Sequence, residues 1–212
     1  MTQGLYAICD ISFSSHKSQH ELAQQLLAGG AKILQLRMKN AKDLNRVREQ
    51  AQKILEEKKN YNFCFVLNDY VELALELGVD GIHVGENDLP VSEVRKIVGP
   101  QMLIGYSSHS IEEAKQAEAE GADYVALGAI FPTATKGPGR PVQGLEKLKE
   151  FVAQISIPKV AIGGITWDNL EGVLNTGVDA IAMITALSKA EDVSKATELY
   201  IKKIATLSAR YR

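Results

Sequence analysis

Short apolar runs alternate along this chain with longer amphipathic stretches. Between the runs, Ala, Leu and Ile recur at steps of three and four residues, the period of an amphipathic helix. The runs are almost continuously apolar, as parallel strands covered on both faces are. The eight runs span residues 5–9, 32–36, 63–67, 81–85, 102–106, 124–128, 159–163 and 180–184. This pattern predicts eight parallel strands separated by helices.

A short repeat marks every second predicted strand. Gly-(Ala or Val)-(Asp or Lys) precedes or opens the second, fourth, sixth and eighth runs, at residues 30–32, 78–80, 121–123 and 177–179. The repeat implies four successive (βα)2 units, which an open doubly wound sheet does not require. It therefore favours a closed (βα)8 barrel, a TIM barrel, and we expect residues 1–212 to form a single domain.

Composition and charge narrow the function. The chain is 45% hydrophobic and 24% charged with a formal net charge of −2, which predicts neither a nucleic-acid binder nor an anionic-membrane binder. No apolar run approaches the roughly 18 residues of a membrane span, and the N-terminus does not resemble a signal peptide. Cys9 and Cys64 lie in apolar runs and are expected to be buried, reduced thiols. We expect a cytoplasmic protein.

Candidate chemistry is sought directly after the strands, because barrels of this kind carry their active sites at the carboxyl ends of the strands. After the second run, alternation places Gln35, Arg37 and Lys39 on one side of the chain. If that side faces inward, the two cations bind an anion through charge-assisted hydrogen bonds. The spacing favours this interpretation over a solvated basic strand end.

Carboxylates follow the third and fourth runs. Asp69 comes after Asn68, and Asp88 follows Glu86-Asn87. Beside a basic anion site, the two aspartates suit Mg²⁺ held between protein and a diphosphate. Taken alone, either aspartate fits a helix N-cap as well as a metal ligand. Their combination with the basic residues favours the metal site.

The fifth run ends beside several polar residues. Ser107 stands nearest the end of the strand and is placed to contact a ligand. Ser110 with Glu113 three residues later matches a capping box, which is a structural arrangement. His109 fits a loop histidine with satisfied hydrogen bonds better than a catalytic base.

The last strands predict phosphate binding. Residues 131–141 form a long loop rich in Gly and Pro, which suits a lid. Thr133, Thr135 and Lys136 in it offer donors to phosphate, although an irregular connector with a solvated lysine has the same composition. Gly164 after the seventh run, and Ile184-Thr185 after the eighth, suit a backbone phosphate site at the start of a short helix.

Taken together, these segments resemble the thiamine-phosphate synthases and the related thiazole tautomerases. The resemblance extends from Leu5 to about Ser188. Its motifs, in order, are Gln35-Leu36-Arg37-Met38-Lys39, Leu67-Asn68-Asp69, Gly81-Ile82-His83-Val84-Gly85 with Asp88, Ile104-Gly105-Tyr106-Ser107, residues 128–136, and Ala161-Ile162-Gly163-Gly164-Ile165.

The resemblance implies a Mg²⁺-dependent transferase of thiamine biosynthesis. Such an enzyme joins 4-amino-5-hydroxymethyl-2-methylpyrimidine diphosphate to a thiazole phosphate and releases diphosphate and thiamine phosphate. The implied sites are Gln35, Arg37, Lys39, Asn68 and Lys136 for the pyrimidine diphosphate, Asp69 and Asp88 for Mg²⁺, and Ser107, Thr133, Thr135, Gly164, Ile184 and Thr185 for the thiazole phosphate. A homodimer is a further expectation from the size of the barrel.

The reaction explains which residue types are present. Charge develops on the departing diphosphate, so Arg37, Lys39 and Lys136 are the expected catalytic residues. The thiazole nitrogen is already nucleophilic and captures the pyrimidine cation, so the protein needs neither a nucleophile nor a general base. A lid over residues 131–141 would keep water from the cation.

Three other functions compete with the synthase. A thiazole tautomerase has a histidine directly after the glycine of the sixth strand, where this chain has Ala129. A catalytically silent paralogue, binding thiazole phosphate or a protein, would not need the basic residues and both aspartates. A phosphate-sugar epimerase predicts paired carboxylates or metal-binding histidines on several strands, whereas His83, alone in a strand, fits a packed histidine. The synthase is favoured.

Overall fold

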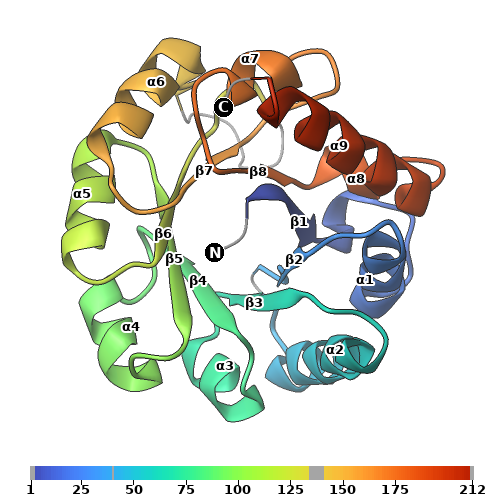
Figure 1. The fold of residues 1–212 in the computed structure, drawn as a ribbon. Coiled ribbons are helices and arrows are strands. Elements are labelled where there is room, and N and C mark those ends of the chain that lie inside the picture. Colours follow the sequence, from blue (N-terminus) through green and yellow to red (C-terminus); the bar gives the residue numbers. More distant parts are fainter. Residues whose placement is uncertain (1–2, 40, 134–140, 211–212) are drawn as a thin grey trace.

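The computed structural model describes residues 3–39, 41–133 and 141–210. In these ranges, parallel strands close into a barrel in chain order, and β1 pairs with both β2 and β8 (Figure 1). The strands are β1 Gly4–Cys9, β2 Ile33–Leu36, β3 Cys64–Asn68, β4 Gly81–Gly85, β5 Leu103–Ser108, β6 Tyr124–Leu127, β7 Lys159–Ile162 and β8 Ala180–Met183. The predicted (βα)8 barrel is confirmed.

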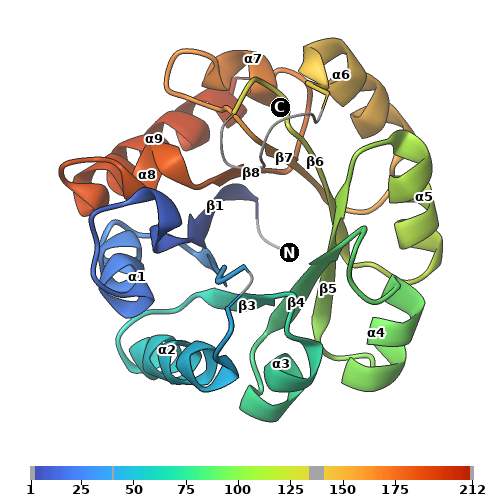
Figure 2. The same cartoon turned by 180° about the vertical axis from the view of Figure 1, so that it is seen from behind.

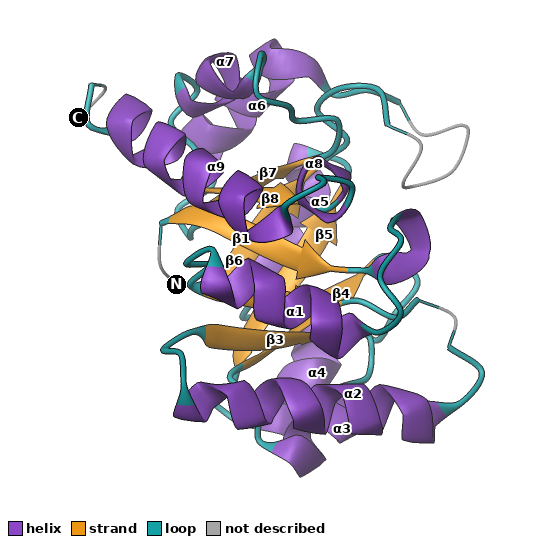
Figure 3. Cartoon of the chain, turned by 90° about the vertical axis from the view of Figure 1, so that its right-hand side faces the viewer, coloured by secondary structure: helices purple, strands orange, loops and turns teal. Residues whose placement is uncertain are grey.

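Helices surround the barrel on all sides, as the two end views show (Figures 1 and 2). In the side view they form a layer outside the strands (Figure 3). The α-helices are α1 Gln19–Ala28, α2 Leu44–Glu56, α3 Val71–Leu77, α4 Val91–Val98, α5 Ile111–Ala119, α6 Gly144–Gln154, α7 Leu170–Leu174, α8 Thr185–Ser188 and α9 Val193–Ser208. Two 3₁₀ turns, η1 Ile11–Phe13 and η2 Glu57–Lys59, follow β1 and α2. No described helix is long and apolar enough to cross a membrane.

The barrel has two apolar layers, because successive side chains of a strand point to opposite faces. In β1, Leu5 and Ala7 pack outward against the helices, whereas Tyr6 and Ile8 belong to the smaller cluster inside the barrel. The outer layer is the larger and receives the apolar faces of the helices, such as Ile54 of α2. Burial of each large apolar side chain contributes about 1.5–3 kcal/mol. Both layers leave the carboxyl ends of the strands for polar groups.

The repeated Gly-(Ala or Val)-(Asp or Lys) step ties neighbouring strands together. Its glycines adopt positive φ angles of 95°, 63°, 99° and 87° in chain order, which permits the turn from helix to strand. Where the third residue is Asp, its carboxylate accepts a hydrogen bond from a backbone N–H at the start of the preceding strand. The pairs are Asp80 with Phe65 (2.6 Å), Asp123 with Ile104 (2.7 Å) and Asp179 with Lys159 (2.8 Å).

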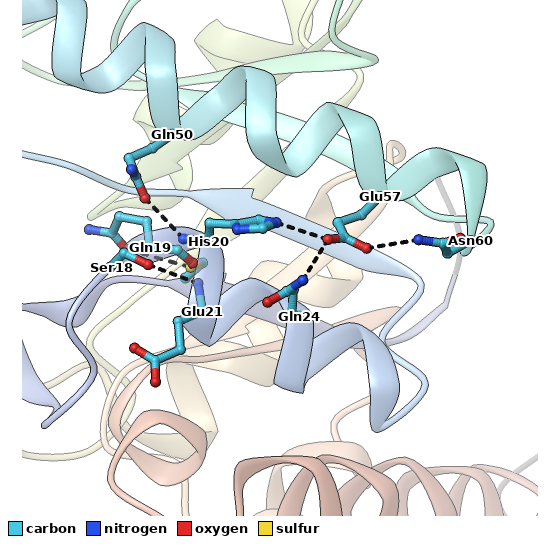
Figure 4. Close-up of polar contacts among 9 residues, drawn as sticks. Ser18, Gln19, His20, Glu21, Gln24, Gln50, Glu57 and Asn60 are labelled. Carbon is cyan, nitrogen blue, oxygen red and sulfur yellow. Dashed lines mark hydrogen bonds and ion pairs between the residues drawn. The ribbon is translucent and has the colours of Figure 1, made fainter.

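A polar cluster joins α1 to α2 and η2 (Figure 4). Glu57 accepts hydrogen bonds from His20 at 2.8 Å, Gln24 at 2.8 Å and Asn60 at 3.3 Å. Gln50 of α2 accepts from the backbone N–H of His20 at 3.0 Å. Burial of Glu57 would raise its pKa, but these hydrogen bonds favour the ionised form and together hold the pKa below its ordinary value. The cluster fixes two outer helices against each other.

Both cysteines carry free thiols, as expected. Cys9 is fully buried, but Cys64 is only partly buried, because it stands at the open start of β3. Burial raises the pKa of both thiols, that of Cys64 to about 11. Neither side chain therefore forms a nucleophilic thiolate near neutral pH.

Candidate active site

A cavity of about 240 Å³ lies at the carboxyl ends of strands β2 to β5. It shares residues with a smaller cavity of about 50 Å³ inside the barrel and lies at the same end as a third, of about 30 Å³, beside β7 and β8. The residues predicted for the site line these cavities: Gln35, Arg37, Lys39, Asn68, Asp69, Asp88, Ser107, Thr133, Gly164, Ile184 and Thr185. Thr135 and Lys136 lie outside the described residues.

A larger apolar cavity, of about 380 Å³, lies elsewhere and is lined by Gly4, Leu5, Ile201 and Ile204 among others. It stands where β1 begins, at the amino end of the barrel. The polar side chains that follow the strands are all at the opposite end. Although this cavity is larger, it is therefore not the candidate active site.

Arg37 is anchored by a carboxylate that the sequence analysis missed. Its guanidinium donates a hydrogen bond to Asp10, which directly follows β1 and is only 1% exposed. The other carboxylate oxygen of Asp10 accepts from the backbone N–H of Ser12 at 2.9 Å. An acidic residue directly after the first apolar run was the available signal. Asp10 holds Arg37 at the edge of the cavity.

Gln35 is two residues before Arg37 and Lys39 is two residues after it. Gln35 lines the cavity inside the barrel, and Lys39 lines the larger cavity at the strand ends. Gln35 is buried inside the barrel and donates a hydrogen bond to the Tyr6 hydroxyl at 2.9 Å. The Lys39 ammonium is half exposed and lies 3.8 Å from an Asp69 carboxylate oxygen. As the alternating spacing predicts, all three side chains line the connected cavities at this end of the barrel.

Asp69 and Asp88 lie close enough to repel each other. Burial, and then the neighbouring Asp88 carboxylate, raise the pKa of Asp69 to about 6, against the opposing influence of Lys39 and Arg37. Asp69 has a φ of 70°, a left-handed conformation that residues other than glycine rarely adopt. Its backbone N–H is fixed by the His83 carbonyl at 2.9 Å. Such strain is typical of functional sites.

Neither aspartate caps a helix. The N-cap positions of α3 and α4 are Tyr70 and Pro90, and neither forms a side-chain capping bond. Asp88 instead accepts a hydrogen bond from the backbone N–H of Gly85 at 2.8 Å, which folds the turn after β4 around it. The helix-cap alternative that the sequence left open is therefore removed for both carboxylates.

The two carboxylates fit a magnesium ion. In the described ranges no group of three or more His, Cys, Asp or Glu side chains is arranged to hold a metal by itself. Mg²⁺ in phosphate-binding enzymes commonly takes one or two carboxylates and completes its shell with substrate oxygens and water. A cation between Asp69 and Asp88 would also relieve the repulsion that raises the pKa of Asp69.

The end of β5 separates structural from ligand-facing serines. Ser110 caps α5 by accepting from the Glu113 N–H at 3.0 Å, as predicted, while Glu113 accepts from the His109 N–H at 2.8 Å. The backbone N–H of His109 is thus satisfied, and its Nδ1 lies 3.4 Å from a Glu113 carboxylate oxygen. Ser107 lines the cavity, and its hydroxyl lies 2.8 Å from Nε2 of His83. His83 is packed inside the barrel, as expected, and is hydrogen-bonded there.

The ends of β7 and β8 form the third cavity. Gly164 has a φ of 66°, and a Cβ atom there would lie 2.6 Å and 2.7 Å from the carbonyl oxygens of Pro132 and Phe131. Only glycine fits this close approach. The cavity is also lined by Thr133, Ile184 and Thr185. Small residues and backbone therefore dominate this part of the site.

The chain is similar to proteins of known name over almost its full length. Residues 5–187 match the family model described as thiamine monophosphate synthase. A thiamine-phosphate synthase of Clostridium novyi is 40% identical over 92% of this chain and 95% of its own, and one of Pyrococcus furiosus is 43% identical over 92% and 91%. A solved structure of thiamine phosphate pyrophosphorylase from Pyrococcus furiosus has a TM-score of 0.88 at 39% identity, covering 97% of this chain and 96% of that one.

Proposed function

The chain belongs to the thiamine monophosphate synthase family, and on that premise we propose that it joins 4-amino-5-hydroxymethyl-2-methylpyrimidine diphosphate to a thiazole phosphate. The carbon–oxygen bond to diphosphate breaks, the thiazole nitrogen forms the new carbon–nitrogen bond, and diphosphate and thiamine phosphate leave. The observation that carries the proposal is one cavity in which Arg37 and Lys39 stand beside Asp69 and Asp88. Anion-binding and cation-binding groups side by side are what a metal diphosphate requires.

Arg37 and Lys39 are the proposed diphosphate-binding residues among those described. Asp10 occupies part of the Arg37 guanidinium and leaves its other N–H donors for phosphate oxygens. Lys39, which is half exposed at the edge of the cavity, supplies a second positive charge. Lys136, outside the described residues, is proposed as the third cation. Together they stabilise negative charge as it develops on the leaving group.

Asp69 and Asp88 are the proposed magnesium ligands, supported by their mutual repulsion and by the strained backbone of Asp69. When bound, Mg²⁺ would neutralise charge on the diphosphate oxygens. The hydrogen bond from the Gly85 backbone N–H fixes the position of the Asp88 carboxylate. Asn68, buried beside Asp69, is proposed to bind the pyrimidine diphosphate with Gln35.

The thiazole phosphate is proposed to bind at the ends of β7 and β8, with Ser107 contributing from β5. Thr133, Gly164, Ile184 and Thr185 line the third cavity, and Thr135 would join them. Because Gly164 has no side chain, its backbone can approach a phosphate closely. This third cavity and the barrel interior share Ile184, so the two substrates would meet above the barrel axis.

The thiazole tautomerase alternative is not favoured. The position where that branch has its histidine is Ala129, which is buried and cannot transfer a proton. We also propose a cytoplasmic location, supported by two free thiols. The homodimer stays a prediction.

The test is formation of thiamine phosphate by the purified protein from the two substrates and Mg²⁺, read as thiochrome fluorescence. EDTA should abolish the product, and Lys136→Ala should reduce it strongly, while Lys149→Ala, a lysine paired with Glu146 on the exposed side of α6, should not. A protein that binds thiazole phosphate but makes no product would contradict the proposal.

A further inference from the structure

A continuous chain of hydrogen bonds crosses the inside of the barrel beneath the proposed site. It runs from Gln35 to Tyr6 at 2.9 Å, from Tyr6 to Tyr124 at 2.7 Å, from Tyr124 to Nδ1 of His83 at 3.0 Å, and from Nε2 of His83 to Ser107 at 2.8 Å. Its two ends, Gln35 and Ser107, both line the cavity inside the barrel. The chain therefore connects two residues proposed to contact substrate.

The direction of the hydrogen bonds follows from the first one. Gln35 donates its amide N–H to the Tyr6 oxygen, and although either hydroxyl can donate in the Tyr6–Tyr124 contact, this bond favours donation from Tyr6 to Tyr124. Tyr124 in turn donates to Nδ1 of His83. A neutral imidazole then carries its proton on Nε2 and donates it to Ser107. In this arrangement the two tyrosines and His83 each pass a hydrogen bond on in the same direction.

This direction leaves different atoms for the ligand at the two ends. Gln35 has its carbonyl oxygen and its second amide N–H left, and the carbonyl oxygen can only accept hydrogen bonds. Ser107 has its hydroxyl proton left, because its oxygen already accepts from His83. The first end suits an amino group, and the second suits a phosphate oxygen. The reverse direction would turn the Gln35 amide nitrogen toward the ligand and use up the Ser107 proton.

Packing holds the middle of the chain in place. Tyr6 and Tyr124 are 1% and 0% exposed, and their rings contact each other at a centroid distance of 5.9 Å. Burial raises the pKa of both hydroxyls, so both stay protonated and can donate. Tyr124 crosses β5 at Gly105, where a Cβ atom would lie 2.3 Å from its hydroxyl. The middle groups have little room to rearrange.

We propose that Tyr6, Tyr124 and His83 are positioning residues that keep the Gln35 carbonyl oxygen and the Ser107 hydroxyl proton directed at the substrates. On the proposed function, Gln35 then accepts a hydrogen bond from the 4-amino group of the pyrimidine. A 4-oxo pyrimidine, which presents an acceptor at that position, is rejected because two acceptors would face each other. The three residues thereby set selectivity through Gln35 and Ser107.

The test compares the 4-amino pyrimidine diphosphate with its 4-oxo analogue in wild type, Tyr6→Phe and Tyr124→Phe. Affinity for each compound is measured by calorimetry with Mg²⁺, and kcat/KM is measured for the amino compound. Tyr200→Phe on α9, a mostly buried tyrosine packed against Trp167, is the matched control. Melting temperatures report any general loss of stability.

Wild type and Tyr200→Phe should prefer the amino compound. Tyr6→Phe and Tyr124→Phe should each lose about tenfold or more of that preference, because Gln35 can then rotate. If the hydrogen bonds are merely structural, the two substitutions will lower the melting temperature and leave the ratio of the two affinities unchanged. That result would overturn the proposal. If the variants do not fold, a wild type that binds the two compounds equally, or prefers the oxo compound, overturns it as well. A protein that makes no thiamine phosphate would contradict the proposed function. The present inference is decided separately, by the measured affinities for the two pyrimidine compounds.

Discussion

The buried carboxylate of Asp10, directly after β1, accepts a hydrogen bond from the guanidinium of Arg37, directly after β2. Asp10 is the more deeply buried of the pair, and its second oxygen is held by the backbone of Ser12. The carboxylate is therefore rigid, and it fixes the orientation of the arginine rather than the reverse. A positioned guanidinium loses less freedom when a diphosphate arrives.

Replacing Asp10 with Asn should weaken catalysis with little loss of fold. The amide oxygen can still accept from Ser12, but the charge that holds Arg37 is gone. We expect kcat/KM for the pyrimidine diphosphate to fall about tenfold or more, the value of one charge-assisted hydrogen bond. Asp43→Asn is the matched control, because Asp43 makes the same backbone contact to Asn45 without an arginine partner. Equal kinetics in both variants would show that Asp10 does not position Arg37.

Asp69→Asn should separate stability from activity. Removing one of two repelling carboxylates should raise the free energy of unfolding in metal-free protein by about 1 kcal/mol. Mg²⁺ should stabilise the wild type by binding its folded state but should stabilise this variant much less. Activity should fall about a hundredfold.

Thermal unfolding with and without Mg²⁺ checks this prediction. Glu86→Gln is its control, because Glu86 is an exposed carboxylate that lines the same cavity and is not a proposed ligand. A shift in melting temperature with Mg²⁺ that is the same in all three proteins would rule out Asp69 as a ligand.

Glu57→Gln should lower stability in a pH-dependent way. The folded-state pKa of Glu57 lies below its ordinary value of 4.5, so its contribution is fully present above about pH 4.5 and is lost as the pH falls through the folded-state value. Near neutral pH we expect wild type to be more stable than the variant by about 1 kcal/mol. The difference should shrink in acid, and kcat/KM should not change.

Urea unfolding at neutral and acidic pH measures this difference. Glu76→Gln serves as the comparison, because Glu76 pairs with Arg48 on the exposed surface and should affect stability little at either pH. A Glu57 effect that is constant with pH would mean that its ionised form is not favoured by the hydrogen bonds in Figure 4.

Gly105→Ala should disrupt the barrel interior. A Cβ atom there would lie 2.0 Å from Cζ of Tyr124 and 2.5 Å from Nδ1 of His83. We expect a loss of about 2–3 kcal/mol in unfolding free energy from this overpacking, together with reduced activity. Gly172→Ala in α7 meets only Leu145 Cδ1 at 3.1 Å and should be tolerated. Similar melting temperatures for both variants would contradict the packing described for Tyr124.

The strand pattern was predictable because burial on both faces leaves a continuous apolar signal. The run 81–85 coincides with β4, Gly81–Gly85. The run 102–106 stopped short of the end of β5, which continues through Ser107 and Ser108 in register with β6. The apolar pattern ends where the polar residues of the site begin. A hydrophobic pattern therefore does not predict the ends of strands that carry functional residues.

The site was predictable where its residues are neighbours along one strand. Gln35, Arg37 and Lys39 follow from alternation alone. Asp10 was missed because its partner lies 27 residues away, and the Tyr6–Tyr124 contact spans 118 residues. Tyrosines inside apolar runs look like ordinary core residues. Only closure of the barrel brings such hydroxyls together.

The central claim is most directly tested by measuring thiamine phosphate and diphosphate together, in one reaction of the purified protein with both substrates and Mg²⁺. The two products should appear in equal amounts, and neither should appear when the thiazole phosphate is left out or EDTA is added. Diphosphate released without thiamine phosphate, or no product from a folded protein that binds both substrates, would contradict it.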